Sequence, residues 1–77
     1  MNRIEELDRV ILNVDLPNLG LEKGDIGNVV MIYNNGEGYE VEFMTFDGNT
    51  IAVETLSAHQ IRKVSVREIP HVRELLM

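Results

Sequence analysis

The residues of this chain whose types could support chemistry are two histidines, three central glutamates and a short basic cluster. His59 and His71 are twelve residues apart, and a single histidine completes neither a catalytic pair nor a metal site. The sequence has no cysteine, no nucleophile motif and no phosphate-binding loop. We therefore expect a protein that is not an enzyme and that uses neither a cofactor nor a metal.

The stretch from Leu21 to Tyr33 joins a charged turn to a continuous β-favouring run. Gly24 and Gly27 predict a turn and then a bend, because glycine reaches backbone angles that other residues adopt only with strain. The pair lacks the third glycine and the βαβ setting of a dinucleotide site. The apolar run 29–33 favours a strand covered on both sides, and it is far too short to span a membrane.

The composition predicts one small folded domain. A hydrophobic content of 44% over 77 residues is enough for a single core, and the absence of cysteine favours a reducing compartment. The N-terminus has no apolar segment of signal-peptide length, so we expect a cytoplasmic protein without membrane attachment.

The charge balance bears on the class of partner. Thirteen acidic residues against seven basic ones give a formal charge of −6. Nucleic acids bind clustered Lys and Arg through their phosphates, so this average field disfavours them. A protein with a basic or neutral surface is the partner that we expect.

Five short strands can be read along the chain. The first covers residues 8–15 and alternates, with Val10, Leu12 and Val14 on its core side. A Pro-containing loop leads to the second strand, 29–33, and Asn-Gly then predicts a tight hairpin to the third, 39–44.

The first hairpin sets which side chains share a face. With Asn35-Gly36 as a two-residue loop, Tyr33 pairs with Gly38 and Val30 with Val41. A three-residue loop would invert these faces, and this alternative stays open. The core face then consists of Val30, Ile32, Tyr39, Val41 and Phe43.

The second hairpin is predicted to turn at residues 46–48, with the glycine in the left-handed conformation and a bulge beside it. This register pairs Val41 with Val53 and Glu40 with Glu54. A two-residue loop would pair Val41 with Glu54, and we reject it because it would bury a charge or expose a core residue.

These elements predict an all-β fold, a small five-stranded SH3-like barrel over residues 1–65. Residues 56–60 are expected to form a short helical turn before the last strand, 61–66. An OB-fold is the nearest rival, but it would need a longer helix between its third and fourth strands.

Residues 66–77 are predicted to be a C-terminal tail. Its apolar residues recur at roughly helical spacing, so the tail either packs on its own barrel as a short helix or docks on a second copy to form a homodimer. Both readings stay open. The residues concerned are Ile69, Val72, Leu75, Leu76 and Met77.

The pattern Gly24-Asp25-Ile26-Gly27-Asn28-Val29-Val30, with Leu16-Pro17 before it and Tyr39-Glu40-Val41-Glu42-Phe43 after it, resembles an uncharacterised family. Its members are small bacterial SH3-like proteins, common in cyanobacteria, classed as a domain of unknown function. The resemblance covers residues 7–64 and implies no catalytic residue. Because such small genes often sit beside other short genes, it implies an accessory or antitoxin-like role.

The same turn and strand are more distantly similar to the KOW motif of ribosomal and transcription-elongation proteins. KOW-type modules meet RNA or proteins through a basic loop, whereas the corresponding turn here, Glu22-Lys23-Gly24-Asp25, is not basic. The resemblance nevertheless implies an alternative function, an RNA-binding or ribosome-associated module. Its cations would be Arg62, Lys63 and Arg67.

The predicted partner site is an apolar centre rimmed by acids, a common plan for a protein interface. The competing interpretation is a solvated sheet face with charges that prevent edge pairing, next to the second face of a bent strand. The site consists of Val29, Met31, Tyr33, Glu40, Glu42 and Glu54.

Overall fold

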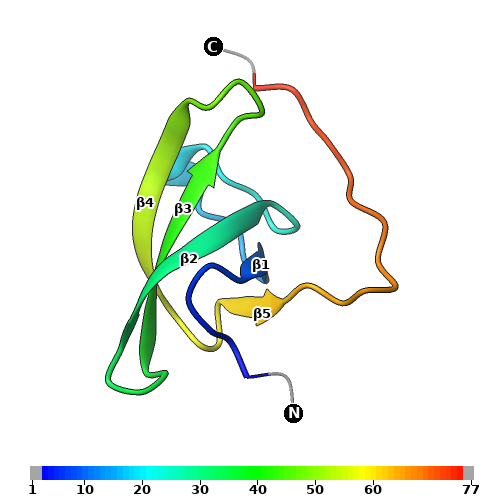
Figure 1. Ribbon diagram of the computed structural model, residues 1–77. Helices are drawn as coiled ribbons and strands as arrows, with labels where there is room; N and C mark the ends of the chain where they lie inside the picture. The colour runs from blue at the N-terminus through cyan, green and yellow to red at the C-terminus, as the bar shows by residue number, and fades with distance from the viewer. Residues whose placement is uncertain (1–2, 76–77) are drawn as a thin grey trace.

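The computed structural model describes residues 3–75 as one antiparallel sheet of five strands in the order β4-β3-β2-β1-β5 (Figure 1). The sheet is not closed, so β4 and β5 lie at its two edges. No helix in this range is long and apolar enough to cross a bilayer. The all-β prediction is confirmed, and closure into an SH3-like barrel stays a prediction. The strands are β1 Arg9–Leu12, β2 Ile26–Tyr33, β3 Gly38–Met44, β4 Thr50–Ser57 and β5 Ile61–Lys63.

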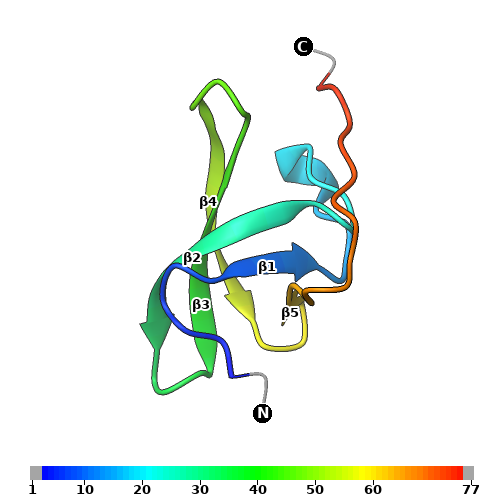
Figure 2. The same ribbon diagram turned by 45° about the vertical axis from the view of Figure 1, so that its right-hand side comes forward.

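Strand β2 belongs to both halves of the sheet. Its first residues pair with β1, where Val10 lies opposite Gly27, and its remainder pairs with β3, where Tyr33 lies opposite Gly38. Figures 1 and 2 show β2 curving from the β3–β4 side of the molecule across to β1. A bent strand of this kind lets one sheet fold around a single core.

The core lies on the concave side of this sheet. The prediction of Val10, Leu12, Tyr39, Val41 and Phe43 as core residues is confirmed, since each is at most 7% exposed. The remaining fully buried hydrophobic side chains among the described residues are Leu21, Val29, Leu56 and Ile61.

A β-bulge in β2 makes part of the predicted core wrong. The register with β3 shifts between Val29 and Met31, so Val29 rather than Val30 lies opposite Val41. Val29 is therefore 0% exposed, whereas Val30 is 41% exposed. The predicted pairing next to the turn, Tyr33 with Gly38, is correct because the shift occurs further along the strand.

The β3–β4 hairpin departs from the prediction in the same way. Its three-residue loop forms as expected, with Gly48 at a φ of +92° and Met44 opposite Thr50. A shift between Phe43 and Met44 then leaves an extra residue in β4, so that Val41 lies opposite Glu54, the pairing rejected above. Val53, predicted in the core, is 47% exposed.

The predicted helical turn before β5 is also wrong. Residues 58–60 close as a simple turn, with the N–H of Gln60 donating to the carbonyl of Ser57 at 3.0 Å. The short 3-10 helix η1, Pro17–Leu19, lies instead in the loop after β1. Residues 64–75 contain no helix; Leu76 and Met77 of the predicted tail pattern lie outside the described residues.

The backbone of β2 passes very close to the core side chains of β3, and this contact can be tested at Gly27. A Cβ there would lie 2.6 Å from Cγ1 of Val41 and 2.8 Å from Cε1 of Phe43. We expect Gly27→Ala to lower the free energy of unfolding by about 1–3 kcal/mol, the usual cost of overpacking, as measured by urea denaturation. Gly38→Ala is the matched control, since a Cβ there meets nothing closer than 3.8 Å. Equal effects at the two positions would contradict the close approach.

Candidate functional site

The candidate site is the face of the β2–β3–β4 sheet that points away from the core, here called the outer face. Directly opposed residues of neighbouring antiparallel strands point to the same side. Glu40 lies between Met31 and Thr55, and Glu42 lies between Asn28 and Val53. The outer face therefore consists of Asn28, Met31, Tyr33, Glu40, Glu42, Val53 and Thr55.

Apolar side chains on this face are open to solvent. Met31 is 48% exposed, Tyr33 39% and Val53 47%, whereas Glu40 and Glu42 are half-buried between them. The structure thus brings together four of the six residues of the predicted site, namely Met31, Tyr33 and the two glutamates.

Hydroxyl groups hold the two carboxylates in place. Oε1 of Glu40 accepts hydrogen bonds from the Thr55 hydroxyl at 2.7 Å and from the Tyr33 hydroxyl at 3.2 Å. Oε2 of Glu42 accepts one from the Thr50 hydroxyl at 2.6 Å. Neither glutamate forms an ion pair with another residue in the range 3–75. The outer face therefore presents two oriented negative charges without neutralising them.

Two predicted site residues lie elsewhere, and these placements are corrections. Val29 cannot touch a partner because the bulge turns it into the core. Glu54 lies opposite Val41, on the core-facing side of the edge strand β4, where its side chain stays partly exposed. An inward-pointing charge on an edge strand is a known device against sheet-to-sheet aggregation.

The distribution of charge along the sequence is a signal that the site prediction missed. Residues 26–57 hold five of the 13 acidic residues and none of the seven basic ones, so they carry −5 of the formal charge of −6. This stretch forms β2, β3 and β4. The negative field of the protein is therefore concentrated on the half of the sheet that bears the outer face.

The basic cluster named in the alternative prediction is largely neutralised. The Arg62 guanidinium binds both carboxylate oxygens of Glu68, at 3.0 and 2.6 Å. This contact and the N–H of Ser65 lower the pKa of Glu68 to about 2. Nζ of Lys63 lies 3.4 Å from the carboxylate of Asp8. Two of the three cations thus serve contacts within the chain.

The chain matches the family model described as Domain of unknown function (DUF4926) over residues 6–63. It belongs to this family. The matched range contains all five strands, so the DUF4926 domain includes the outer face and ends before the tail. No curated protein and no solved structure matches the chain. Within residues 3–75, no three or more His, Asp or Glu side chains gather so as to hold a metal ion.

The hydrogen bond between Tyr33 and Glu40 makes a prediction about the pKa of the tyrosine. This bond, followed by burial and by the charge of Glu40, raises the pKa of Tyr33 above its usual value of 10.0, because the phenol must give up its proton beside a carboxylate. We expect Glu40→Gln to lower the pKa of Tyr33 toward 10.0, as followed by carbon NMR of the tyrosine rings. Glu42→Gln, the matched control, leaves it unchanged. A pKa of Tyr33 that Glu40→Gln does not lower would contradict the arrangement.

Proposed function

We propose that this DUF4926 protein is a non-enzymatic interaction module that binds another protein through the outer face. The observation that supports the proposal is the combination of exposed Met31 and Tyr33 with two oriented carboxylates that form no ion pair with any residue from 3 to 75. In protein interfaces, apolar and aromatic side chains supply most of the affinity, and charges supply steering and specificity. The partner is then a protein with basic residues around an apolar patch.

The SH3-like architecture is part of this proposal. Its support is the strand order, in which β1 pairs with both β2 and β5, and the sharing of β2 between the two halves of the sheet. At 77 residues the chain is a small module, and its proposed site is an exposed sheet face. An accessory or antitoxin-like role beside a larger protein, in the cytoplasm, fits such a module.

The alternative of a KOW-like RNA-binding module receives less support. An RNA site needs several cations that are free to meet phosphates. Arg62 and Lys63 are already paired with carboxylates, and residues 26–57 contribute no cation at all. The observations therefore favour a protein partner over RNA.

The proposal is tested by reversing the charge of the outer face. We expect Glu40→Lys combined with Glu42→Lys to weaken the binding of the natural partner at least tenfold, since it replaces attraction by repulsion across the interface. The partner is first captured from source cells with the wild-type chain, identified by mass spectrometry and purified, and its affinity is then measured by calorimetry.

The matched control is Glu5→Lys combined with Glu6→Lys, which changes the net charge equally at exposed positions outside the sheet. It should bind the partner as the wild type does. If both double variants weaken binding equally, the effect comes from the overall charge of the protein. If the outer-face double variant binds as the wild type does, the proposal is refuted. A filter-binding titration with RNA at low salt tests the alternative, which predicts that the protein retains RNA on the filter.

A further inference from the structure

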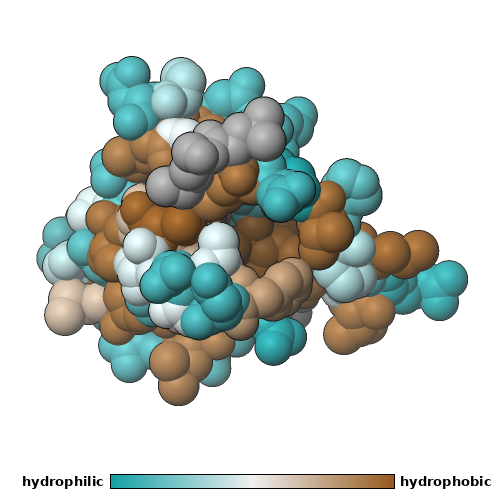
Figure 3. All heavy atoms as spheres, turned by 90° about the horizontal axis from the view of Figure 1, so that it is seen from above, coloured by the Kyte–Doolittle hydropathy of each residue, from teal (hydrophilic) through white to brown (hydrophobic). Residues whose placement is uncertain are grey.

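Beyond Glu68, the described part of the tail is held to the rest of the protein by one arginine. Residues 64–75 form neither a strand nor a helix, and Val66, Ile69 and Val72 are 101%, 92% and 67% exposed. Figures 1 and 3 show this segment projecting from the side of the molecule, with hydrophobic side chains on the projection. Beyond residue 68, the side-chain hydrogen bonds and ion pairs within the described range all belong to Arg73.

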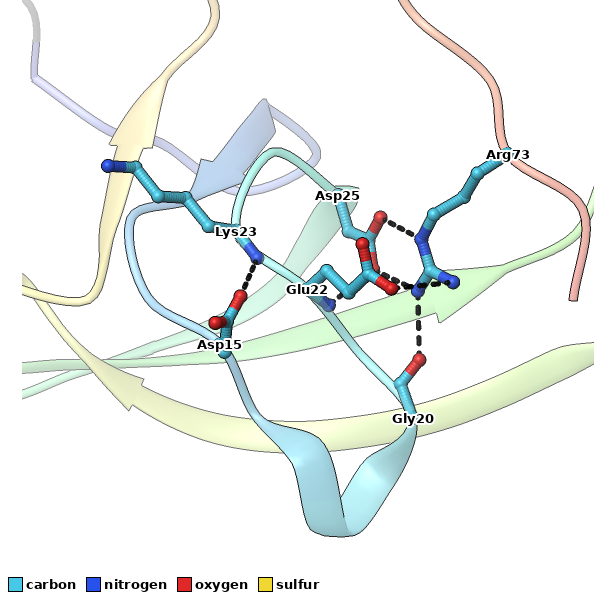
Figure 4. Close-up of polar contacts among 6 residues, drawn as sticks. All are labelled: Asp15, Gly20, Glu22, Lys23, Asp25 and Arg73. Atoms are coloured by element: carbon cyan, nitrogen blue, oxygen red, sulfur yellow. Dashed lines mark hydrogen bonds and ion pairs between the residues drawn. The ribbon is translucent and has the colours of Figure 1, made fainter.

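The guanidinium of Arg73 lies against the loop before β2 (Figure 4). The acceptors that surround it belong to Gly20, Glu22 and Asp25 and are here called the notch. Its Nε and Nη2 donate to the two carboxylate oxygens of Asp25 at 2.8 and 2.6 Å. Nη2 also donates to the carbonyl of Gly20 at 2.8 Å, and Nη1 lies 3.6 Å from the carboxylate of Glu22. Such bidentate binding of one carboxylate selects arginine by the planar shape of its guanidinium as well as by its charge.

The notch is organised by bonds that do not involve the tail. The N–H of Glu22 donates to the Asp25 carboxylate at 2.8 Å, and the N–H of Lys23 donates to Asp15 at 2.8 Å. Gly20 ends η1 in the left-handed conformation, with its N–H bonded to the carbonyl of Pro17, which fixes the direction of its own carbonyl. The loop is anchored in the core by Leu21, which is 4% exposed. The acceptors are thus in position before an arginine arrives.

The Asp25 carboxylate is suited to bind a cation in this position. Its side chain is only 18% exposed, against 63% for that of Glu22. Burial would raise its pKa, but the hydrogen bonds from Arg73 and from the N–H of Glu22 outweigh this and hold the pKa below its usual value. The carboxylate therefore remains charged while it is partly withdrawn from water, where an ion pair is stronger than at a fully exposed site.

We propose that this notch is an arginine-binding site, that Arg73 is its displaceable occupant, and that its ligand is an arginine on an extended segment of a partner protein. The bound guanidinium shows which chemistry the notch accepts. Because Arg73 makes the only side-chain hydrogen bonds and ion pairs along the described residues 69–75, a partner segment that brings its own arginine and further contacts can displace the tail. Displacement would release the exposed apolar residues of the tail. The site is separate from the outer face and does not depend on the function proposed for that face.

The test uses the full chain carrying Arg73→Ala, which empties the notch, and a synthetic peptide of residues 66–75 as the probe. We expect NMR titration to show binding, with shifts of the amides of Gly20, Glu22 and Asp25. The peptide carrying Arg73→Lys should bind at least tenfold more weakly, because an ammonium group cannot meet both carboxylate oxygens and the carbonyl together. The peptide carrying Arg67→Ala is the matched control and should bind like the original.

Two further comparisons separate the parts of the proposal. The wild-type chain should bind the peptide several-fold more weakly than the Arg73→Ala chain, because its own tail fills the notch. An unrelated Gly/Ser-rich peptide with one central arginine should shift the same amides, as a partner's segment would. Adding Asp25→Asn to the Arg73→Ala chain should abolish both effects.

Several results would overturn the inference. Equal binding of the Arg73→Lys peptide, or binding that survives Asp25→Asn, would show that the notch does not recognise arginine. Failure of the unrelated arginine peptide would limit the contact to the chain's own tail. A wild-type dimer that becomes monomeric on Arg73→Ala, measured by light scattering, would identify the occupant as the tail of a second copy. If Arg73→Ala fails to fold, the chain with Arg73→Lys serves for all of these measurements.

Discussion

The structure depends on the bend that carries β2 from one half of the sheet to the other. Gly27 allows it, because the β2 backbone runs so close to Val41 and Phe43 that a side chain would collide with them. The bulge between Val29 and Met31 follows at once and shifts the register by one residue. Because side chains alternate along a strand, this single shift puts Val29 in the core and leaves Val30 partly exposed. The outer face loses Val29 as a result, and Met31 and Tyr33 stay on it beside Glu40.

The faces of a strand could be predicted from the sequence where polar and apolar residues alternate. They could not be predicted where the strand is apolar throughout. In β3, a glycine and two glutamates alternate with Tyr39, Val41 and Phe43, so only one assignment of its faces buries these three residues. The run 29–32 in β2 is apolar throughout, so a shift of its register by one residue buries no polar side chain of the run. The extra residue in β4 was not predicted because a pairing of Val41 with Glu54 was expected to bury a charge or expose a core residue. Strand β4 is an edge strand, where Glu54 can face the core side and still reach water.

The same difference between strands decided which residues of the candidate site could be predicted from the sequence. The face on which Glu40 and Glu42 lie was predicted correctly because they belong to the alternating strand, whereas Val29 and Glu54 belong to the two strands that slip. The contact of Arg73 with Asp25 joins residues 48 positions apart, and no local pattern predicts such a pair. The absence of Lys and Arg from residues 26–57 was visible in the sequence. It becomes informative only when these residues are known to form one part of a sheet.

The pairing of β2 with β3 tests the central claim most directly. The N–H and C=O of Val29 bond to Asp8 and Leu7 on one side, so its Hα faces β3 on the other. Residues paired in this way bring their Cα atoms to about 4.5 Å. Proton NMR should therefore show a strong Hα–Hα contact between Val29 and Val41, as their pairing requires. A contact between Val30 and Val41 in its place would mean an unbroken ladder, and both the bulge and the burial of Val29 would then be wrong.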